Sequence, residues 1–86
     1  MDIRDQFGNI LRDLRKAKGL TQEELAFRAG MSVPYLSDLE RGKNNPSLAV
    51  LVDLARALDA EVVELVAGLD ISDGQGPTSR KRTADQ

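Results

Sequence analysis

The sequence predicts a small all-α protein of five helices, followed by a polar C-terminal tail. A chain of 86 residues gives room for one domain, since domains usually contain about 50 to 250 residues. Apolar residues recur at intervals of three and four, which is the period of an amphipathic helix. Glycines and Ser or Thr residues separate the apolar stretches, in the order expected where one helix ends and the next begins.

The first helix is predicted over roughly Asp2 to Lys18. Its apolar residues lie three or four positions apart and form one stripe: Ile3, Phe7, Ile10, Leu11, Leu14 and Ala17. Gly19 then supplies the left-handed conformation that ends many helices, and Leu20 can pack back on the last turn.

Two short helices with a tight turn between them are predicted next. Thr21 and Glu24 have the spacing of a capping box, which starts a helix over about Gln22 to Ala29. Gly30 ends this helix, and Ser32 offers the next N-cap only two residues later. Two short helices joined by a glycine-containing turn form a helix-turn-helix unit, whose second helix can enter the major groove of DNA. On this geometry alone, DNA binding and ordinary packing in a small bundle both remain open.

The third helix begins after Ser32, and Pro34 fits its first turn because the missing N–H has no intrahelical partner there. Leu36 and Leu39 give this helix a narrow apolar edge, and Gly42 ends it. Its other face is polar and is therefore expected at the surface.

Two more helices are predicted after a polar loop, Lys43–Pro46. Ser47 caps the fourth helix, whose predicted apolar set is Leu48, Leu51, Val52, Ala55 and Leu58. The fifth helix is expected over Glu61 to Leu69, and its apolar residues surround the helix instead of occupying one face. Residues 1–69 are therefore expected to form the domain, and residues 70–86 a disordered tail.

The composition excludes several kinds of chemistry. The chain contains no Cys and no His, and hence no thiolate nucleophile and no zinc finger of the usual ligand types. It also lacks a glycine-rich phosphate loop, and a bundle of this size hardly provides a cleft for paired carboxylates. We therefore expect no enzymatic activity, no metal and no cofactor. No apolar run reaches the roughly 18 residues of a membrane span and no signal peptide is apparent, so we expect a soluble, cytoplasmic protein.

Charge is unevenly distributed along the chain, although the net charge is only −2. Basic residues outnumber acidic ones between Arg12 and Lys43, and the balance reverses between Asp53 and Asp70. Such a split is usually just solvated surface, but it suits a domain that approaches DNA by its basic end.

The run from Leu20 to Pro46, LTQEELAFRAGMSVPYLSDLERGKNNP, resembles the lambda-repressor/Cro-like family, also called the XRE family. The similarity covers about residues 4–69 and includes LRxxRKAKGLTQ, YLSDLERGK and NPSL. It implies a compact five-helix, lambda-repressor-like bundle that binds DNA sequence-specifically, usually as a dimer. Most members are transcriptional regulators of bacteria and phages, so the resemblance also implies a bacterial or phage-encoded, nucleoid-associated protein.

The candidates for reading base edges lie on the face of the third helix opposite Leu36 and Leu39: Ser32, Val33, Pro34, Ser37, Asp38 and Arg41. Val33 and Pro34 could pack on a thymine methyl, where many relatives carry long polar side chains. Asp38 could accept from cytosine N4, although an acidic residue is repelled by phosphates, and Arg41 could bind guanine or a phosphate.

Phosphate contacts are expected at the start of the second helix and around the third: Gln22, Tyr35, Lys43, Asn44 and Asn45. Gln22 is the clearest of these, because a helix N-terminus attracts anions. The basic run Arg80-Lys81-Arg82 in the tail could follow the DNA backbone, although such runs are usually only solvated.

Two further sets of residues have structural roles. The resemblance places Arg15 and Glu40 at positions that relatives use for an internal ion pair between the first and third helices. Val62 and Leu65 are expected to face the core. Val63, Val66 and Leu69 are expected on the opposite flank of the fifth helix, where a second copy of the chain would cover them.

These observations predict a dimeric DNA-binding transcriptional regulator, in its simplest form a repressor of an inverted-repeat operator. Its partners would be double-stranded DNA and a second copy of the chain. The alternatives are an antitoxin or other protein-interaction module with an unknown protein partner, and a controller protein of a restriction-modification operon. No apolar stretch follows Ile71 that could fold on a toxin, which weighs against an antitoxin. The neighbouring open reading frame would separate the alternatives; the operator sequence and the direction of regulation are not visible in the sequence.

Overall fold

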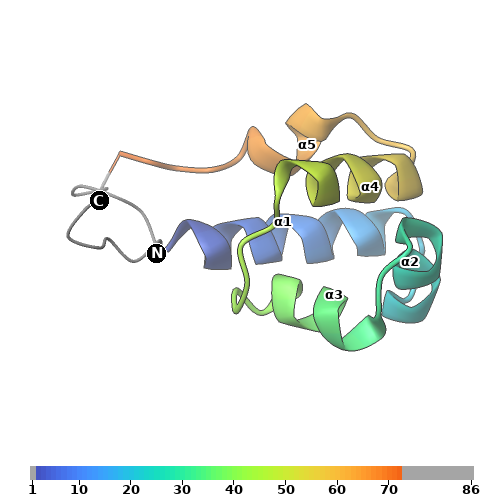
Figure 1. The fold of residues 1–86 in the computed structure, drawn as a ribbon. Helices are drawn as coiled ribbons and strands as arrows, with labels where there is room; N and C mark the ends of the chain where they lie inside the picture. Colours follow the sequence, from blue (N-terminus) through green and yellow to red (C-terminus); the bar gives the residue numbers. More distant parts are fainter. Residues whose placement is uncertain (1, 73–86) are drawn as a thin grey trace.

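The computed structural model describes residues 2–72, and these fold into helices joined by short turns. The helices are α1 (Ile3–Ala17), α2 (Gln22–Ala29), α3 (Val33–Glu40), α4 (Leu48–Leu58) and α5 (Val62–Val66). In Figure 1, α1 runs through the middle of the bundle, with α4 and α5 on one side, α3 on the other and α2 at one end. The prediction of an all-α protein with five helices is confirmed for the described part of the chain.

Side-chain caps define the starts of α2 and α3, the two helices on either side of the tight turn. The hydroxyl of Thr21 accepts a hydrogen bond from the Glu24 N–H at 3.0 Å, and the Glu24 carboxylate accepts one from the Thr21 N–H at 2.8 Å. Gly30 ends α2 with a φ of 72°, and the Ser32 hydroxyl then accepts from the Tyr35 N–H at 3.2 Å. The capping signals in the sequence therefore gave the correct bounds for α2 and α3.

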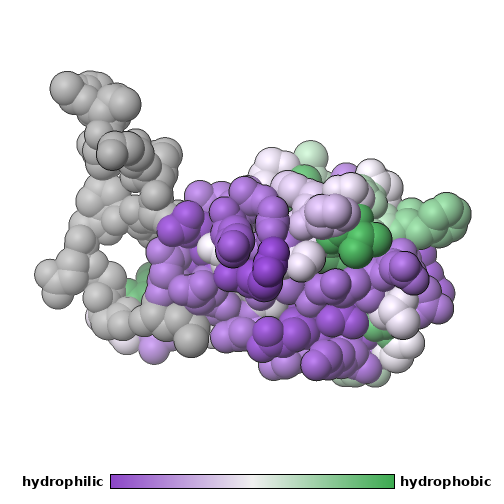
Figure 2. Space-filling model, turned by 90° about the horizontal axis from the view of Figure 1, so that it is seen from below, coloured by the Kyte–Doolittle hydropathy of each residue, from purple (hydrophilic) through white to green (hydrophobic). Residues whose placement is uncertain are grey.

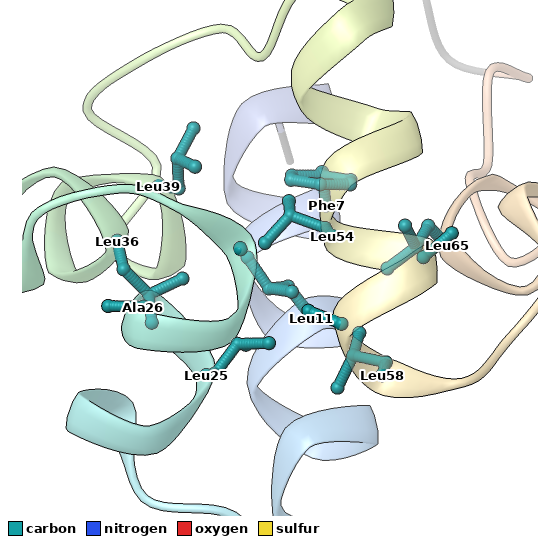
Figure 3. Packing of buried hydrophobic residues seen from close by; sticks show 12 residues of the cluster. Phe7, Leu11, Leu25, Ala26, Leu36, Leu39, Leu54, Leu58 and Leu65 are labelled. Atoms are coloured by element: carbon teal, nitrogen blue, oxygen red, sulfur yellow. The ribbon is translucent and has the colours of Figure 1, made fainter.

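One hydrophobic core joins all five helices (Figure 3). Its largest fully buried side chains are all leucines and come from every helix: Leu11, Leu25, Leu36, Leu39, Leu54, Leu58 and Leu65. Leu36 and Leu39 anchor α3 to this core, so the predicted apolar edge of α3 is the buried one.

The buried face of α4 differs from the prediction. Leu54 and Ala57, which were not assigned to the apolar set, are buried, whereas Leu48 is 74% exposed. The face that packs on the bundle is centred between Leu54 and Leu58. Leu48 lies about a quarter turn away from it, since each residue advances by about 100° around a helix. The prediction of Leu48 as a core residue was therefore wrong.

The fifth helix is shorter than predicted and ends at Val66 instead of Leu69. Glu61 still begins it, as the N-cap residue whose backbone N–H donates to the Glu64 carboxylate at 2.9 Å. Beyond the helix, Asp70 is held by α1, because the Gln6 amide donates to its carbonyl at 3.0 Å and accepts from its N–H at 2.7 Å. These two bonds connect the segment after α5 to the N-terminal half of α1.

The bounds proposed for the tail, residues 70–86, lie mostly outside the described residues, as does the basic run Arg80-Lys81-Arg82. Within residues 2–72, no helix is long and apolar enough to cross a membrane.

Candidate nucleic-acid interface

The end of α3 rests directly on the backbone of α1. A β-carbon added to Gly8 would collide with the Glu40 carbonyl oxygen and would lie 2.7 Å from the Leu39 carbonyl oxygen. Real β-carbons do not approach other atoms so closely, so only glycine allows α3 to lie at this depth. At Gly8 the two helices are therefore in direct backbone contact, with no side chain between them.

A buried ion pair fixes the same end of α3 from the other side. The Arg15 guanidinium donates from Nε to Oε2 of Glu40 at 2.7 Å and from Nη2 to Oε1 at 3.1 Å. Its Nη1 donates to the carbonyl oxygen of Leu20 at 2.9 Å. Both charged residues are buried, with exposures of 8% for Arg15 and 4% for Glu40. The structure thus brings together the two residues that the resemblance placed in an ion pair, and they connect α1 to the last turn of α3.

Gln22 completes this network from the start of α2. Its amide nitrogen donates to Oε1 of Glu40 at 3.0 Å. Because an ionised carboxylate only accepts hydrogen bonds, this contact fixes which way the Gln22 amide points. One amide N–H of Gln22 is thus used by Glu40. No motif in the sequence had indicated this link between α2 and α3.

The outer face of α3 carries the candidates for reading base edges. Leu36, Leu39 and Glu40 are buried, so the opposite face is the one turned to solvent. The candidates on it are exposed or half-buried: Ser32, Val33, Pro34, Ser37, Asp38 and Arg41. Figure 2 shows the molecule from the side on which α3 lies, with a mostly hydrophilic surface and apolar atoms gathered toward one end.

Two of these candidates are bonded to each other. Nη2 of Arg41 lies 3.0 Å from Oδ1 of Asp38, in an ion pair between residues three positions apart. This spacing is visible in the sequence and could have suggested the pair. The Ser32 hydroxyl also has a structural partner, since it caps α3, but its proton remains available to a base or phosphate.

The candidates for phosphate contacts lie at both ends of α3. Lys43 and Asn45 are exposed, and Asn44 and Tyr35 are half-buried. Tyr35 packs partly against the core, which leaves its hydroxyl as the polar end of a mostly apolar contact. Gln22 joins this group through its bond to Glu40, the last residue of α3.

The residues expected in a dimer interface are not equivalent. Val63 is 59% exposed, whereas Val66 and Leu69 are half-buried and pack against the core of the same chain. The expectation that all three face away from the core therefore holds only for Val63. Val66 and Leu69 instead line an apolar pocket of about 170 Å³, whose wall also includes Ile3, Phe7, Pro46 and Leu51.

Among the described residues, no group of three or more Asp, Glu, His or Cys residues is arranged to hold a metal ion. The polar groups that the bundle does present are hydrogen-bond donors and acceptors along α3 and at the start of α2. Such groups suit contacts with phosphates and base edges.

Comparison with known proteins gives a consistent family match. The model of the helix-turn-helix family HTH_3 matches residues 11–65. The HTH-type transcriptional regulator y4dJ of Sinorhizobium fredii is 50% identical over 70 residues, which span 81% of this chain and 91% of that protein. The immunity repressor protein of Bacillus phage phi105 is 42% identical over 59 residues, but these span only 41% of the repressor.

A solved structure agrees in both fold and sequence. The restriction-modification controller protein C.AhdI from Aeromonas hydrophila superposes with a TM-score of 0.71 and is 50% identical. The match covers 72% of this chain and 94% of C.AhdI. The similarity therefore includes nearly the whole of that small regulator.

Proposed function

Because this chain belongs to the XRE-type helix-turn-helix family HTH_3, whose members here are DNA-binding transcriptional regulators, we propose that it is a repressor that binds an inverted-repeat operator as a homodimer. Residues 1–69 form the DNA-binding and dimerisation domain. The protein acts in the cytoplasm, on nucleoid DNA, and catalyses no reaction. The alternative as an antitoxin receives no support from the described residues.

The observation that carries the proposal is the way in which α3 is held. Gly8 seats the end of α3 on α1, and the buried Arg15–Glu40 pair holds it there. Leu36 and Leu39 lie on the buried face of α3, and Ser37, Asp38 and the N-terminal turn lie on its outer face. A helix fixed in this way presents one side to the major groove without further rearrangement.

Phosphate contacts would place α3 in the groove. The start of α2 offers unpaired backbone N–H groups and the second amide N–H of Gln22. Lys43, Asn44 and Asn45 follow α3 and supply a cation and two amides. Both groups lie near the C-terminal end of α3, and their phosphate contacts would anchor that end while the outer face of α3 reads the bases.

A second copy of the chain would complete the operator contact. The exposed Val63 and the pocket lined by Val66 and Leu69 form apolar surface at α5. Residues 73–86 contain no large apolar residue, and a second copy of the chain is the occupant that we propose for this surface. A two-fold dimer would place two copies of α3 about 34–36 Å apart, which is the separation of half-sites one helical turn apart.

A controller of a restriction-modification operon is a second candidate, because the similarity to C.AhdI covers 94% of that regulator. Both candidates bind DNA as small dimers, so they differ in their genomic target. Chromatin immunoprecipitation from the native host separates them: enrichment upstream of adjacent restriction and modification genes identifies a controller, and enrichment elsewhere identifies a repressor of other genes.

Selection from a random pool of DNA duplexes tests the proposal directly. We expect enrichment of an inverted repeat, with tighter binding to the complete repeat than to a single half-site. Lys43→Ala should weaken binding to every sequence. Asp53→Ala, in the acidic region between Asp53 and Asp70, also changes the net charge by one unit and serves as the control. Failure to enrich any sequence would contradict sequence-specific binding, and enrichment of a single half-site would contradict the dimer.

A further inference from the structure

Asp38 is the one acidic side chain among the base-reading candidates, and it is already bonded. Its Oδ1 lies 3.0 Å from Nη2 of Arg41, and both side chains remain partly exposed, 37% for Asp38 and 59% for Arg41. The pair therefore lies on the surface of α3 that would face DNA. Two opposite charges at this spacing on a helix attract each other only weakly in water, so the pair contributes little to folding.

The backbone beneath this pair is fixed. The N–H of Arg41 donates to the Ser37 carbonyl at 3.0 Å, and the N–H of Lys43 donates to the Asp38 carbonyl at 2.9 Å. Gly42 closes the helix with a φ of 78°. Since the Cα atoms of both residues are held, the direction of the Arg41 side chain depends on what its guanidinium contacts.

Asp38 leaves most of that guanidinium available. An arginine has five N–H donors in a planar fork, and only one bond to Asp38 is formed here. The remaining donors can reach acceptor atoms on DNA, which are guanine O6 and N7 or phosphate oxygens. A free carboxylate at this position would repel the phosphates, but its pairing with Arg41 offsets the charge.

We propose that Asp38 is a positioning residue for Arg41: it holds the guanidinium in the orientation that donates to acceptor oxygens or N7 of the DNA, and does not itself read a cytosine. This inference rests on the proposed DNA binding. It explains why an acidic residue can occupy a surface that approaches phosphates. It also makes the two residues one functional unit instead of two independent contacts.

A double-mutant cycle, which measures affinity for the selected operator, tests whether Asp38 acts through Arg41. Asp38→Ala should weaken binding about two- to tenfold, which corresponds to the cost of ordering one long side chain at an interface. In the Arg41→Ala background the same change should have no weakening effect. Asp38→Asn should restore much of the lost affinity, because its amide oxygen can still accept from Arg41. Asp53→Ala removes the same charge at the acidic end of the chain and serves as the control for long-range electrostatics.

The salt dependence and the selected sequence identify the acceptor. If Arg41 donates to a phosphate, Arg41→Ala lowers the salt slope by about one and leaves the selected sequence unchanged. If it donates to guanine, Arg41→Ala relaxes the preference at one position of each half-site. In both cases Asp38→Ala should give a smaller change of the same kind.

Two results would overturn the inference. Equal weakening by Asp38→Ala with and without Arg41 would show that Asp38 contacts DNA itself. Tighter binding of Asp38→Ala in both backgrounds would show that the carboxylate only repels phosphates. Circular dichroism and thermal unfolding of each variant confirm that α3 is intact, as expected for exposed side chains. Absence of any selected sequence for the unaltered protein would instead contradict the proposed function.

Discussion

Arg15 and Glu40 are 25 positions apart in the chain, and their side chains meet in the interior through two hydrogen bonds of 2.7 and 3.1 Å. Each side chain has one further partner, since Arg15 donates to the Leu20 carbonyl and Glu40 accepts from the Gln22 amide. The pair joins α1 to α3 and also contacts the start of α2. Loss of either charge should therefore affect all three helices together.

Glu40→Ala should lower the free energy of unfolding by about 3–5 kcal/mol, because it leaves the Arg15 guanidinium buried without its partner. Urea denaturation measures this value. Asp38→Ala breaks an exposed ion pair on the same helix and should cost less than about 1 kcal/mol. Similar losses for both variants would show that burial of the Arg15–Glu40 pair has no energetic consequence.

Gly8→Ala should destabilise the protein by about 1–3 kcal/mol or more, because the new methyl group collides with backbone carbonyls that cannot rotate away. Gly68→Ala is the matched control. Its added carbon would lie 3.3 Å from Cδ1 of Ile10, the far end of a flexible side chain, so a loss of less than about 1 kcal/mol is expected. Thermal unfolding of both variants would reveal an equal loss if the close contact between α1 and α3 were unimportant.

The capping box of α2 should make stability depend on pH in the acidic range. The hydrogen bond from the Thr21 backbone N–H, followed by the contact with the Thr21 hydroxyl, lowers the pKa of Glu24 below its ordinary value of 4.5. A lowered pKa means that this contribution is complete above pH 4.5 and is lost as the pH falls through the pKa of the folded state.

Glu24→Gln keeps an acceptor for the Thr21 N–H but removes the titrating charge, so its stability should fall less steeply between about pH 5 and pH 3. Glu23→Gln removes a charge from the same turn without changing the capping box, and should retain the slope of the unaltered protein. Denaturation at several pH values compares the three proteins, and parallel curves for all of them would exclude a role of Glu24.

Val63→Glu should convert a dimer to a monomer. Full burial of a valine contributes roughly 1.5–3 kcal/mol, and a two-fold interface contains two copies of Val63, so the dissociation constant should rise by about 100-fold or more. Analytical ultracentrifugation at micromolar concentration measures the mass. Phe27→Glu changes another highly exposed apolar residue, on α2, and should leave the mass unchanged. A monomeric unaltered protein would exclude the interface.

DNA affinity should fall steeply with rising salt concentration, although the net charge of the protein is negative, because most of its contacts with DNA are expected to be to phosphates. Lys43→Ala should lower the slope of the logarithm of affinity against the logarithm of salt concentration by about one. Fluorescence anisotropy with labelled operator gives this slope. A flat dependence for the unaltered protein would show that phosphates are not the main contacts.

The elements predicted best from the sequence are those fixed by local contacts. Thr21, Glu24, Gly30 and Ser32 determine both ends of α2 and the start of α3 through bonds to residues three or four positions away, and the sequence shows such neighbours directly. The buried face of α4 was harder, because Leu48 and Leu54 are equally apolar. Only the position of the other helices decides which of them is covered.

The same distinction applies to the candidate site. The outer face of α3 followed from the burial of Leu36 and Leu39, and was predicted correctly as surface. The bond between Gln22 and Glu40 joins residues 18 positions apart and depends on how α2 meets α3. The bond between Gln6 in α1 and Asp70, beyond the end of α5, likewise joins residues far apart in the sequence.

The two hydrogen bonds between Gln6 and Asp70 also have a consequence for the order in which parts of the protein fold. They close a ring of chain that contains most of α1 and all of α2 to α5, since the two residues are 64 positions apart. Closing such a ring has an entropic cost that is recovered only when the intervening helices are already packed. Residues 67–70 should therefore be the last to dock and the first to detach, in local openings that leave α2 and α3 undisturbed. We therefore expect α3, which is proposed to read DNA, to keep its structure when this segment opens.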